Sequence, residues 1–565
     1  MEKRSKLMPV GVEDFRKLIE KHYYFVDKTR FIKQLIDEPT DVTLITRPRR
    51  FGKTLTLSML RYFFTLDQAA ENRCLFHGLD IERAGESYMA EQGQRPVIFL
   101  TLKNAQSLKW EDELSKVAMI LARLYGSYAF LQDSSALAES DRDFFLKIRR
   151  REGSQPDMED ALINLCQMLA QHYGKKPLLL LDEYDAPILA AWEHGYYEEC
   201  IAFMKGFLGS ALKSNDYLDF AVLTGVTRVS KEGIFSGLNN LDVSSVLSDS
   251  YADIFGFTQA EAGTLMKEVG VADQLPKLKQ WYDGYRFGQV EIYNPWSVVN
   301  FIKNGCKFRP YWLNTSGNSI LKDLLLKVDN RRQRELEGLL AGESVEAPII
   351  ENVIYADLQG SRDALFMLLM TAGYLKPIET WEDEYYTDWA RLTIPNIEVR
   401  TAYHREILGY IAPSQGETLL KDMLRAMVEG KAANFEDHLN EILLDYTSYH
   451  DPATQPENFY HGLLLGLTIL LQGHYRVESN RESGYGRFDI AFFPKKKNSP
   501  GIILELKSSD TKGDLKLAAQ EALRQIESKA YAAEFEKDGV LKVWKYGIAF
   551  HGKQVWIEKE GNREE

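Results

Sequence analysis

The chain has 565 residues, 45% hydrophobic and 27% charged, which is an ordinary globular composition with room for several domains. Its net charge is −13, so the surface as a whole does not attract nucleic acid, and any such contact must use a local basic patch. The four cysteines lie far apart without a CxxC pair, which argues against a zinc site or a disulfide framework and favours a cytoplasmic location. The chain shows no signal segment and no apolar run long enough to span a bilayer, so we expect no membrane association.

The first motif is the sequence TRPRRFGKTLTL at residues 46–57. Its second half, Gly52, Lys53 and Thr54, fits the phosphate-loop pattern G-x-x-x-x-G-K-[ST]. Arg47 stands where that pattern has its first glycine. The tripeptide GKT occurs often by chance, so the residues around it must decide between a nucleotide site and a coincidence.

The surroundings of the motif favour a nucleotide site. The β-branched run at 41–46 predicts a buried strand before the loop, and the spacing of apolar residues at 54–64 predicts a helix after it. A loop between a strand and a helix N-terminus presents backbone N–H groups to phosphate. Lys53 would then reach the β- and γ-phosphates, and the Thr54 hydroxyl would bind Mg²⁺.

An acidic strand end supplies the second part of such a site. The sequence LLLLDEYDAP at 178–187 predicts a strand buried on both faces. Asp182 at its end would hold Mg²⁺, and Glu183 is placed to polarise an attacking water, with Asp185 as a further candidate. The alternative is a core strand with a solvated acidic end.

Two more strands, at 96–103 and 219–228, complete a predicted parallel sheet with helices on both faces. Thr224 and Thr227 end the last strand and either sense the γ-phosphate or cap the following turn. Arg228 is a candidate arginine finger, although an arginine in this position is more often a surface residue.

These motifs carry a resemblance to the AAA-ATPase-like family of bacterial proteins, covering about residues 8–400. The matching stretches are PVGVEDFRKLI, RPRRFGKT, LLLLDEYD, TGVTRVSKEGIFSGLNNL, WYDGYRFG and YNPWSVVNF. The resemblance implies that Arg47 belongs to a family variant of the Walker A loop. It predicts an ATP-binding ATPase and leaves the rate of hydrolysis open. The expected ATP-binding residues, within an ATPase domain at 1–256, are Arg49, Arg50, Phe51, Gly52, Lys53, Thr54, Leu55, Asp182 and Thr224. Arg49 and Arg50 either bind phosphate or contact another domain.

The middle region, 257–402, is predicted as a helical lid and a winged-helix-like module. Thr258 and Glu261 form a capping box that begins a helix. WYDGYRFG is interpreted as domain packing rather than part of the nucleotide pocket. A helix and two strands at 363–396 suit a winged helix, but its tip carries four acids that would repel phosphate, which favours a structural or protein-contact role: Glu379, Glu382, Asp383 and Glu384.

A polar helical connector is predicted at 403–455, and the sequence DPATQPEN at 451–458 marks the next boundary. Beyond it, Asp489 lies in the predicted strand YGRFDIAFF, and the strand GIILELK carries Glu505 and Lys507. Alternation along a strand puts Glu505 and Lys507 on one face, where buried charges need a partner or a metal.

This pattern suggests metal-dependent phosphodiester chemistry. Asp489 and Glu505 would bind Mg²⁺ or Mn²⁺, with the backbone carbonyl of Leu506 as a third ligand. A bound metal would lower the pKa of a water, and Lys507 would orient that water and offset phosphate charge. The alternatives are a structural ion pair, or a degenerate nuclease fold kept for binding.

The C-terminal region at 456–565 resembles the PD-(D/E)xK nuclease superfamily in its order of helix, strands, helix and strand. Glu457, on the predicted first helix at 457–472, matches the family's acidic position, and Gln525 and Tyr531 match a Q…Y pair. Phe488 replaces the usual proline before the aspartate. The resemblance implies an α/β restriction-endonuclease-like domain.

The sequence thus predicts an α/β protein in which a P-loop ATPase is coupled to metal-dependent cleavage of nucleic acid, with DNA favoured over RNA. One rival is an ATP-switched module that binds nucleic acid or protein without cutting. Another is a signalling ATPase in defence that forms a nucleotide-dependent homo-oligomer.

Overall fold

The protein divides into two compact units in this computed structural model. One unit comprises Met1–Trp312 with Glu346–Glu398, and the other comprises Leu313–Val345 with Val399–Glu565. The described residues are 7–228, 241–312, 342–350, 361–403, 416–446, most of 474–561 and isolated positions between these ranges.

A five-stranded parallel sheet in the order β2-β3-β4-β1-β5 organises the first unit. Its strands are β1 (Val42–Thr46), β2 (Val97–Thr101), β3 (Leu178–Asp182), β4 (Ala221–Gly225) and β5 (Leu241–Ser244). Every residue of β1, β3 and β4 is buried, as expected for strands covered on both faces. This confirms the predicted parallel α/β sheet. The sequence pattern misses β5, because LDVS is short and mostly half-buried.

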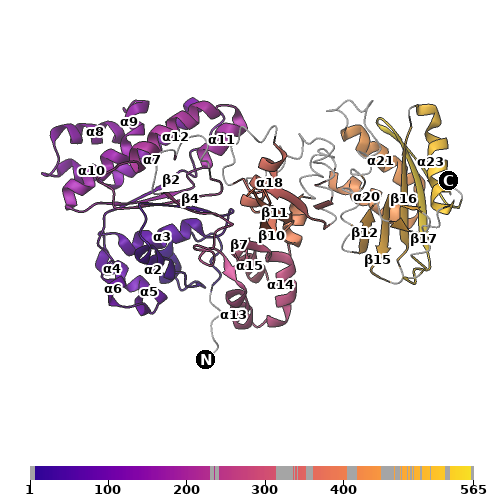
Figure 1. Ribbon diagram of the computed structural model, residues 1–565, viewed down its shortest axis with the longest axis horizontal. Coiled ribbons are helices and arrows are strands. Elements are labelled where there is room, and N and C mark those ends of the chain that lie inside the picture. The colour runs from indigo at the N-terminus through magenta and orange to yellow at the C-terminus, as the bar shows by residue number, and fades with distance from the viewer. Residues whose placement is uncertain are drawn as a thin grey trace. The chain divides into compact units, whose positions relative to one another are not determined.

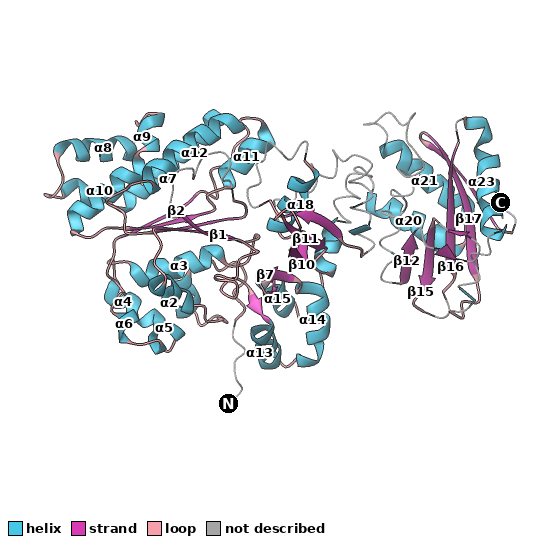
Figure 2. Ribbon diagram, in the orientation of Figure 1, coloured by secondary structure: helices cyan, strands magenta, loops and turns pink. Residues whose placement is uncertain are grey.

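Helices cover both faces of this sheet (Figures 1 and 2). One face carries α7 (Trp110–Ser127), α8 (Glu139–Arg149), α9 (Gln155–Glu159), α10 (Ala161–Tyr173), α11 (Ala186–His194) and α12 (Tyr197–Leu212). The other carries α2 (Arg30–Asp37), α3 (Lys53–Phe64), α4 (Ala69–Arg73), α5 (Asp80–Arg83) and α6 (Glu86–Met89), and α1 (Phe15–Glu20) packs on α3. Short 3₁₀ helices occupy residues 74–76, 129–133, 272–274 and 512–514.

A small antiparallel sheet and three helices follow β5. The sheet has the order β6-β8-β7, with β6 (Phe257–Thr258), β7 (Tyr285–Phe287) and β8 (Val290–Tyr293). The helices are α13 (Gln259–Val269), α14 (Leu275–Tyr282) and α15 (Pro295–Lys303). The predicted capping box is confirmed, because Thr258 and Glu261 bond each other's backbone N–H groups at the start of α13.

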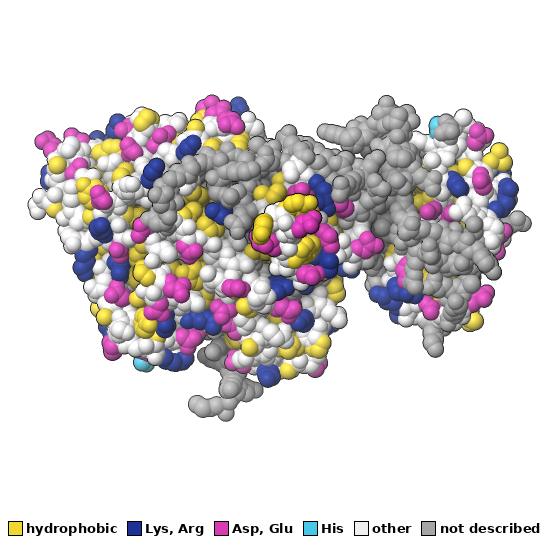
Figure 3. Space-filling model, in the orientation of Figure 1, with side chains coloured by type: hydrophobic (Ala, Val, Ile, Leu, Met, Phe, Trp, Pro, Cys, Tyr) yellow, Lys and Arg dark blue, Asp and Glu magenta, His cyan; other side chains and the backbone are white. Residues whose placement is uncertain are grey.

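A helix followed by a β-hairpin forms the winged-helix-like module, as the sequence predicts. It consists of α18 (Arg362–Thr371), β10 (Lys376–Glu382) and β11 (Asp388–Thr393), and β9 (Val345–Pro348) completes a sheet in the order β10-β11-β9. Figure 3 shows hydrophobic and acidic side chains together over this hairpin. Tyr385 and Tyr386 at its tip are 77% and 85% exposed, beside the exposed Glu382 and Glu384.

The second unit contains a mixed five-stranded sheet in the order β12-β15-β16-β17-β18. Its strands are β12 (Tyr475–Ser479), β15 (Ile490–Pro494), β16 (Gly501–Ser508), β17 (Val543–His551) and β18 (Gln554–Lys559). Only β16 and β17 are parallel within this sheet. A separate two-stranded ribbon pairs β13 (Glu482–Ser483) with β14 (Gly486–Arg487).

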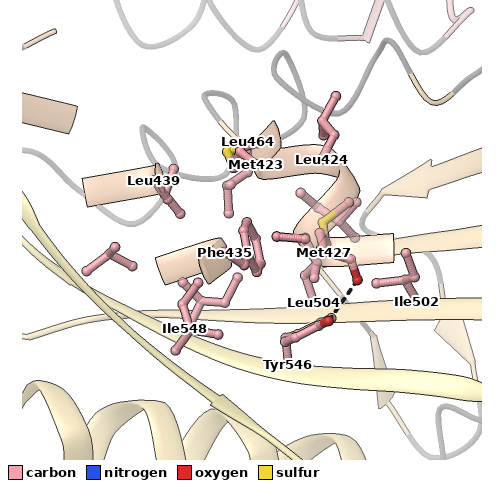
Figure 4. Close-up of a cluster of buried hydrophobic side chains, with 14 of the residues drawn as sticks. Met423, Leu424, Met427, Phe435, Leu439, Leu464, Ile502, Leu504, Tyr546 and Ile548 are labelled. Atoms are coloured by element: carbon pink, nitrogen blue, oxygen red, sulfur yellow. Dashed lines mark hydrogen bonds between the residues drawn. The ribbon is translucent and has the colours of Figure 1, made fainter. Parts of the chain in front are cut away.

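One face of this mixed sheet is covered by α20 (Gly416–Glu429) and α21 (Ala432–Tyr446). Their apolar side chains form one core with alternate residues of β15, β16 and β17 (Figure 4). The Tyr546 hydroxyl donates a hydrogen bond to the Met427 carbonyl at 2.7 Å. The helices of the predicted connector therefore share the core of the C-terminal sheet.

The opposite face is covered by α23 (Leu515–Ser528), which approaches β17 closely at Gly547. A Cβ atom on Gly547 would lie 2.1 Å from the Ala519 carbonyl oxygen and 2.5 Å from the Leu523 nitrogen. Gly547 is also the register partner of Glu505. The glycine thus sets how near α23 lies to the strand that carries the candidate nuclease residues.

Replacing Gly547 with alanine should push α23 away from the sheet and lower the free energy of unfolding by about 1–3 kcal/mol. Urea denaturation followed by circular dichroism measures this loss. Gly513→Ala is the matched control, because a Cβ there meets nothing closer than Thr511 Oγ1 at 4.0 Å. Equal stability of the two variants would contradict the close approach.

Candidate functional site

The phosphate loop runs from the end of β1 to the start of α3, as the sequence predicts. Gly52 lies directly before the helix with φ 88°, a left-handed conformation that a residue with a side chain adopts only with strain. No side chain caps this helix, so its first N–H groups are available to an anion. The local geometry suits phosphate binding.

Lys53 is a buried cation inside the loop. Its Nζ donates to the carbonyl oxygens of Arg47 at 2.7 Å and Pro48 at 2.9 Å. Burial lowers the pKa of Lys53 to about 8, although three neighbouring carboxylates act in the opposite direction: Glu183, Asp185 and Asp182. Carbonyl oxygens compensate a buried charge only in part, so an anion beside Lys53 would be stabilised.

Asp182 joins the loop to the acidic strand. Its Oδ2 accepts a hydrogen bond from Thr54 Oγ1 at 2.8 Å, and its Oδ1 accepts one from Thr224 Oγ1 at 2.7 Å. The carboxylate is completely buried. Since β4 lies between β1 and β3, Thr224 bridges the two halves of the site. The predicted pair Thr54 and Asp182 is therefore brought together, and its oxygen atoms are of the kind that Mg²⁺ prefers.

The next two acids have different surroundings. Glu183 has φ 52°. Its pKa is raised mainly by burial and, to a smaller extent, by the charge of Asp182. Asp185 instead accepts hydrogen bonds from the Val226 N–H, the Thr227 N–H and the Thr227 hydroxyl, all at 2.8–2.9 Å. Asp185 and Thr227 thus shape the segment after β4, which favours the turn interpretation of Thr227. Because its pKa is raised, Glu183 takes up a proton more readily than an ordinary glutamate does.

The other predicted loop residues divide between packing and the surface. The Arg50 guanidinium lies 4.1 Å from the ring centre of Trp296, and Phe51 is buried against β7. Arg49 and Leu55 are partly exposed, and Arg228 is partly buried. For Arg50, these contacts favour the predicted domain-contact alternative. The sequence did not predict that Arg47 is buried. Its only signal was that Arg47 stands where the phosphate-loop pattern has its first glycine.

The C-terminal acids lie on neighbouring strands. Asp489 directly precedes β15, and the pairing of Ile490 with Leu504 places it opposite Glu505. Asp489 Oδ2 accepts a hydrogen bond from the Leu506 N–H at 2.7 Å. Lys507 is two residues beyond Glu505 and so shares its face of β16. The structure therefore brings the three predicted nuclease residues together.

Helix α23 supplies a fourth member of this group. Gln525 Nε2 donates a hydrogen bond to Glu505 Oε1, and Glu505 is only 3% exposed. Two carboxylates at facing positions of neighbouring strands repel each other, so a cation between them would lower the free energy of the site. The donor set of Asp489, Glu505 and a backbone carbonyl fits Mg²⁺ or Mn²⁺. Glu457 and Tyr531 lie outside the described residues.

Metal clusters built from three or more His, Cys, Asp or Glu side chains do not occur among the described residues. Both candidate sites instead combine few carboxylates with hydroxyl or carbonyl oxygens, as is usual for Mg²⁺ that also binds phosphate. None of the described helices is long and apolar enough to cross a membrane.

Comparison with known proteins identifies both regions of the chain. Residues 9–235 match the family model described as predicted AAA-ATPase, and residues 455–560 match the model of the PD-(D/E)XK nuclease superfamily. The chain therefore combines a predicted AAA-ATPase region with a PD-(D/E)XK nuclease superfamily region, which confirms the resemblance carried by the motifs.

A relative from Azotobacter chroococcum mcd 1, an uncharacterized protein in the vnfD 5′ region, is 27% identical over 549 residues. The match covers 94% of each chain, so the similarity runs through both regions.

Replacing Lys53 with methionine should stabilise the protein at neutral pH, because it removes a buried charge. The folded-state pKa of about 8 lies below the ordinary value of 10.5, so the unfolded chain binds more protons between these values. The contribution of Lys53 to stability is therefore unfavourable below pH 8 and fades as the pH rises toward 10.5. At pH 7, thermal melting should show that the free energy of unfolding of Lys53→Met is higher by about 1 kcal/mol or more.

The same comparison at pH 9.5 should show a smaller difference between Lys53→Met and the unaltered protein. Lys205→Met, which removes an exposed lysine of α12, is the control and should change neither melting curve. A less stable Lys53→Met at pH 7 would show that the carbonyl hydrogen bonds outweigh the cost of burying the charge.

Proposed function

We propose that the protein binds ATP at the loop of residues 49–55 and cuts phosphodiester bonds in nucleic acid, with DNA favoured over RNA, in its C-terminal region. The single observation that carries the nuclease assignment is the hydrogen-bonded placement of Asp489 opposite Glu505, with Lys507 on the same face. A structural ion pair would not need a second carboxylate at this position. The superfamily match at 455–560 supports the same reaction class.

In this proposal, Asp489, Glu505 and the Leu506 carbonyl hold Mg²⁺ or Mn²⁺. A bound divalent ion would supply a water of lowered pKa and offset charge on the phosphodiester. The Leu506 N–H fixes one carboxylate and Gln525 fixes the other, so neither acid has to reorganise when the ion enters. Lys507 orients the attacking water and neutralises a phosphate oxygen.

At the nucleotide site, Lys53 contacts the β- and γ-phosphates, and Thr54 with Asp182 holds Mg²⁺. Thr224 keeps Asp182 aligned through its hydrogen bond. Glu183 orients the attacking water, and burial raises its pKa above the ordinary glutamate value, which strengthens it as a proton acceptor. The loop geometry supports ATP binding, while the rate of hydrolysis depends on how Glu183 meets the γ-phosphate.

The two activities are coupled in this proposal, because the ATP state would change how the domains expose the nuclease site. The domains are the ATPase at 1–256, the lid and winged-helix-like region at 257–402, and the nuclease at 456–565, whose core also takes in the helices of the predicted connector at 403–455. All four cysteines are free, which is consistent with the reducing cytoplasm that we propose as its location. A nucleotide-dependent homo-oligomer remains the alternative arrangement.

Purified protein should nick supercoiled plasmid in the presence of Mg²⁺ or Mn²⁺, and chelation should stop the reaction. Asp489→Ala and Lys507→Ala should each lower the rate about 100-fold or more, because each removes a group that acts on the reacting phosphate. Gel electrophoresis of plasmid over time measures the rate. Paired reactions with and without ATP, and with Lys53→Ala, measure the coupling.

A further test variant is Glu505→Gln, which should lower the cutting rate, and its matched control is Glu527→Gln. Both changes remove one carboxylate of this unit, but Glu527 is exposed on α23 and should not affect cutting. Absence of cutting of plasmid, single-stranded DNA and RNA under every condition would favour a non-catalytic binding module. Equal cutting with and without ATP would refute the coupling alone.

The nucleotide site makes a separate prediction. Thr54→Val and Asp182→Asn should weaken the Mg²⁺-dependent part of ATP binding roughly 10-fold or more, because they remove the oxygen ligands. Glu183→Gln should retain ATP affinity but lower kcat about 100-fold. Titration with a fluorescent ATP analogue, with and without Mg²⁺, and phosphate release measure the two effects. Full hydrolysis by Glu183→Gln would exclude this glutamate as the base.

A further inference from the structure

Arg47 occupies a site built around its guanidinium. The side chain is completely buried and donates hydrogen bonds to five backbone carbonyls and one hydroxyl: Thr46 O at 2.9 Å, Ser244 O at 2.9 Å, Ser245 O at 2.8 Å, Ser250 O at 3.3 Å, Tyr251 O at 3.4 Å and Ser244 Oγ at 3.0 Å. Its charge also lies 4.9 Å from the ring centre of Phe287 and 5.6 Å from that of Phe255. Arg47 therefore ties the phosphate loop to β5, the segment after it and the β7–β8 hairpin.

The other residues of RPRRF point to the same neighbours. Phe51 makes edge-on ring contacts with Tyr285 at 4.9 Å and Phe287 at 5.3 Å between centroids. Arg50 stacks on Trp296 of α15. Pro48 lies against Gly373, where an added Cβ would meet the Pro48 Cβ at 2.9 Å. The loop thus contacts the hairpin, α15 and Gly373, two residues beyond the end of α18.

The backbone explains why the usual first glycine is dispensable here. The left-handed residues of the loop are Arg50, with φ 73°, and Gly52, with φ 88°, whereas Arg47 has no positive φ. The turn does not need a glycine at 47, so the position is open to a side chain. The contacts of the Arg47 side chain with residues outside the loop then help to fix the conformation of the loop.

We propose that Arg47 and Phe51 are positioning residues for ATP. Their docking onto residues 244–256 and the β7–β8 hairpin holds the loop in the shape that receives the phosphates. By reciprocity, bound ATP stabilises the hairpin as much as the hairpin favours ATP. The inference rests on the proposed ATP binding and names the contacts through which the nucleotide acts on the region beyond the sheet.

The test alters the hairpin rather than the phosphate ligands. Phe287→Leu removes the ring that contacts both Arg47 and Phe51, and the dissociation constant for ATP should rise roughly 10-fold. The rate of hydrolysis at saturating ATP should stay unchanged, since Lys53, Thr54 and Asp182 are intact. Trp281→Leu is the matched control, because this nearby ring packs on Tyr282 and Phe308, and it should bind ATP normally.

Arg47→Met and Arg47→Lys provide the second pair. Methionine keeps much of the volume without the charge and should weaken ATP binding at least as much as Phe287→Leu. Lysine can still donate to some of the carbonyls and should restore part of the affinity. Circular dichroism melts verify folding. If Arg47→Met does not fold, the ATP affinity of the milder variant Phe287→Leu tests the inference.

Hydrogen exchange provides a readout that a purely structural role would not change. ATP should slow amide exchange at residues 285–293 in the unaltered protein, and this protection should be reduced in Phe287→Leu. Normal ATP affinity in Phe287→Leu, equal losses in Trp281→Leu, or no ATP-induced protection would each overturn the inference. If the unaltered protein binds no ATP, the proposed nucleotide site fails as well, so the two failures are distinguishable.

Discussion

The nucleotide half of the protein depends on how the phosphate loop compensates two buried cations. Arg47 and Lys53 lie six residues apart, and both direct their charges at backbone carbonyls. A buried guanidinium without acceptors would be strongly unfavourable, so the carbonyls of 244, 245, 250 and 251 must stay in place around it. That requirement holds β5 beside β1 and sets the path of the chain into the next subdomain.

The two cations differ in how fully the protein itself compensates their charge. The Arg47 guanidinium donates hydrogen bonds to carbonyls from three parts of the chain, so the fold itself compensates its charge. Lys53 has two carbonyl acceptors and three nearby carboxylates, yet burial still lowers its pKa. An anionic phosphate would compensate this charge better than neutral oxygens do. In the proposed function, Arg47 thus anchors the loop and Lys53 is the cation that binds the ligand.

Both candidate sites prepare a carboxylate in the same way, with hydrogen-bond donors from a neighbouring strand or loop. Asp182 receives hydroxyls from α3 and β4, and Asp489 receives the Leu506 N–H from β16. A carboxylate held by such bonds has its lone pairs aimed before a cation arrives, which reduces reorganisation on binding. Asp185 shows the contrast, because the described hydrogen bonds of its carboxylate all come from the segment after β4.

The amino-acid pattern by itself determined the local features: four of the five parallel strands, the capping box of α13, the hairpin at 376–393, the placement of Asp182 at a strand end, and that of Glu505 and Lys507 on one strand. These follow from periodicity and spacing, which act over a few residues. Only the tertiary structure decided that β5 lies beside β1, that α20 and α21 join the C-terminal core, and that Arg47 is enclosed. Each depends on partners far along the chain, up to 204 residues away for Arg47, and no local pattern records which distant carbonyls will surround a charge.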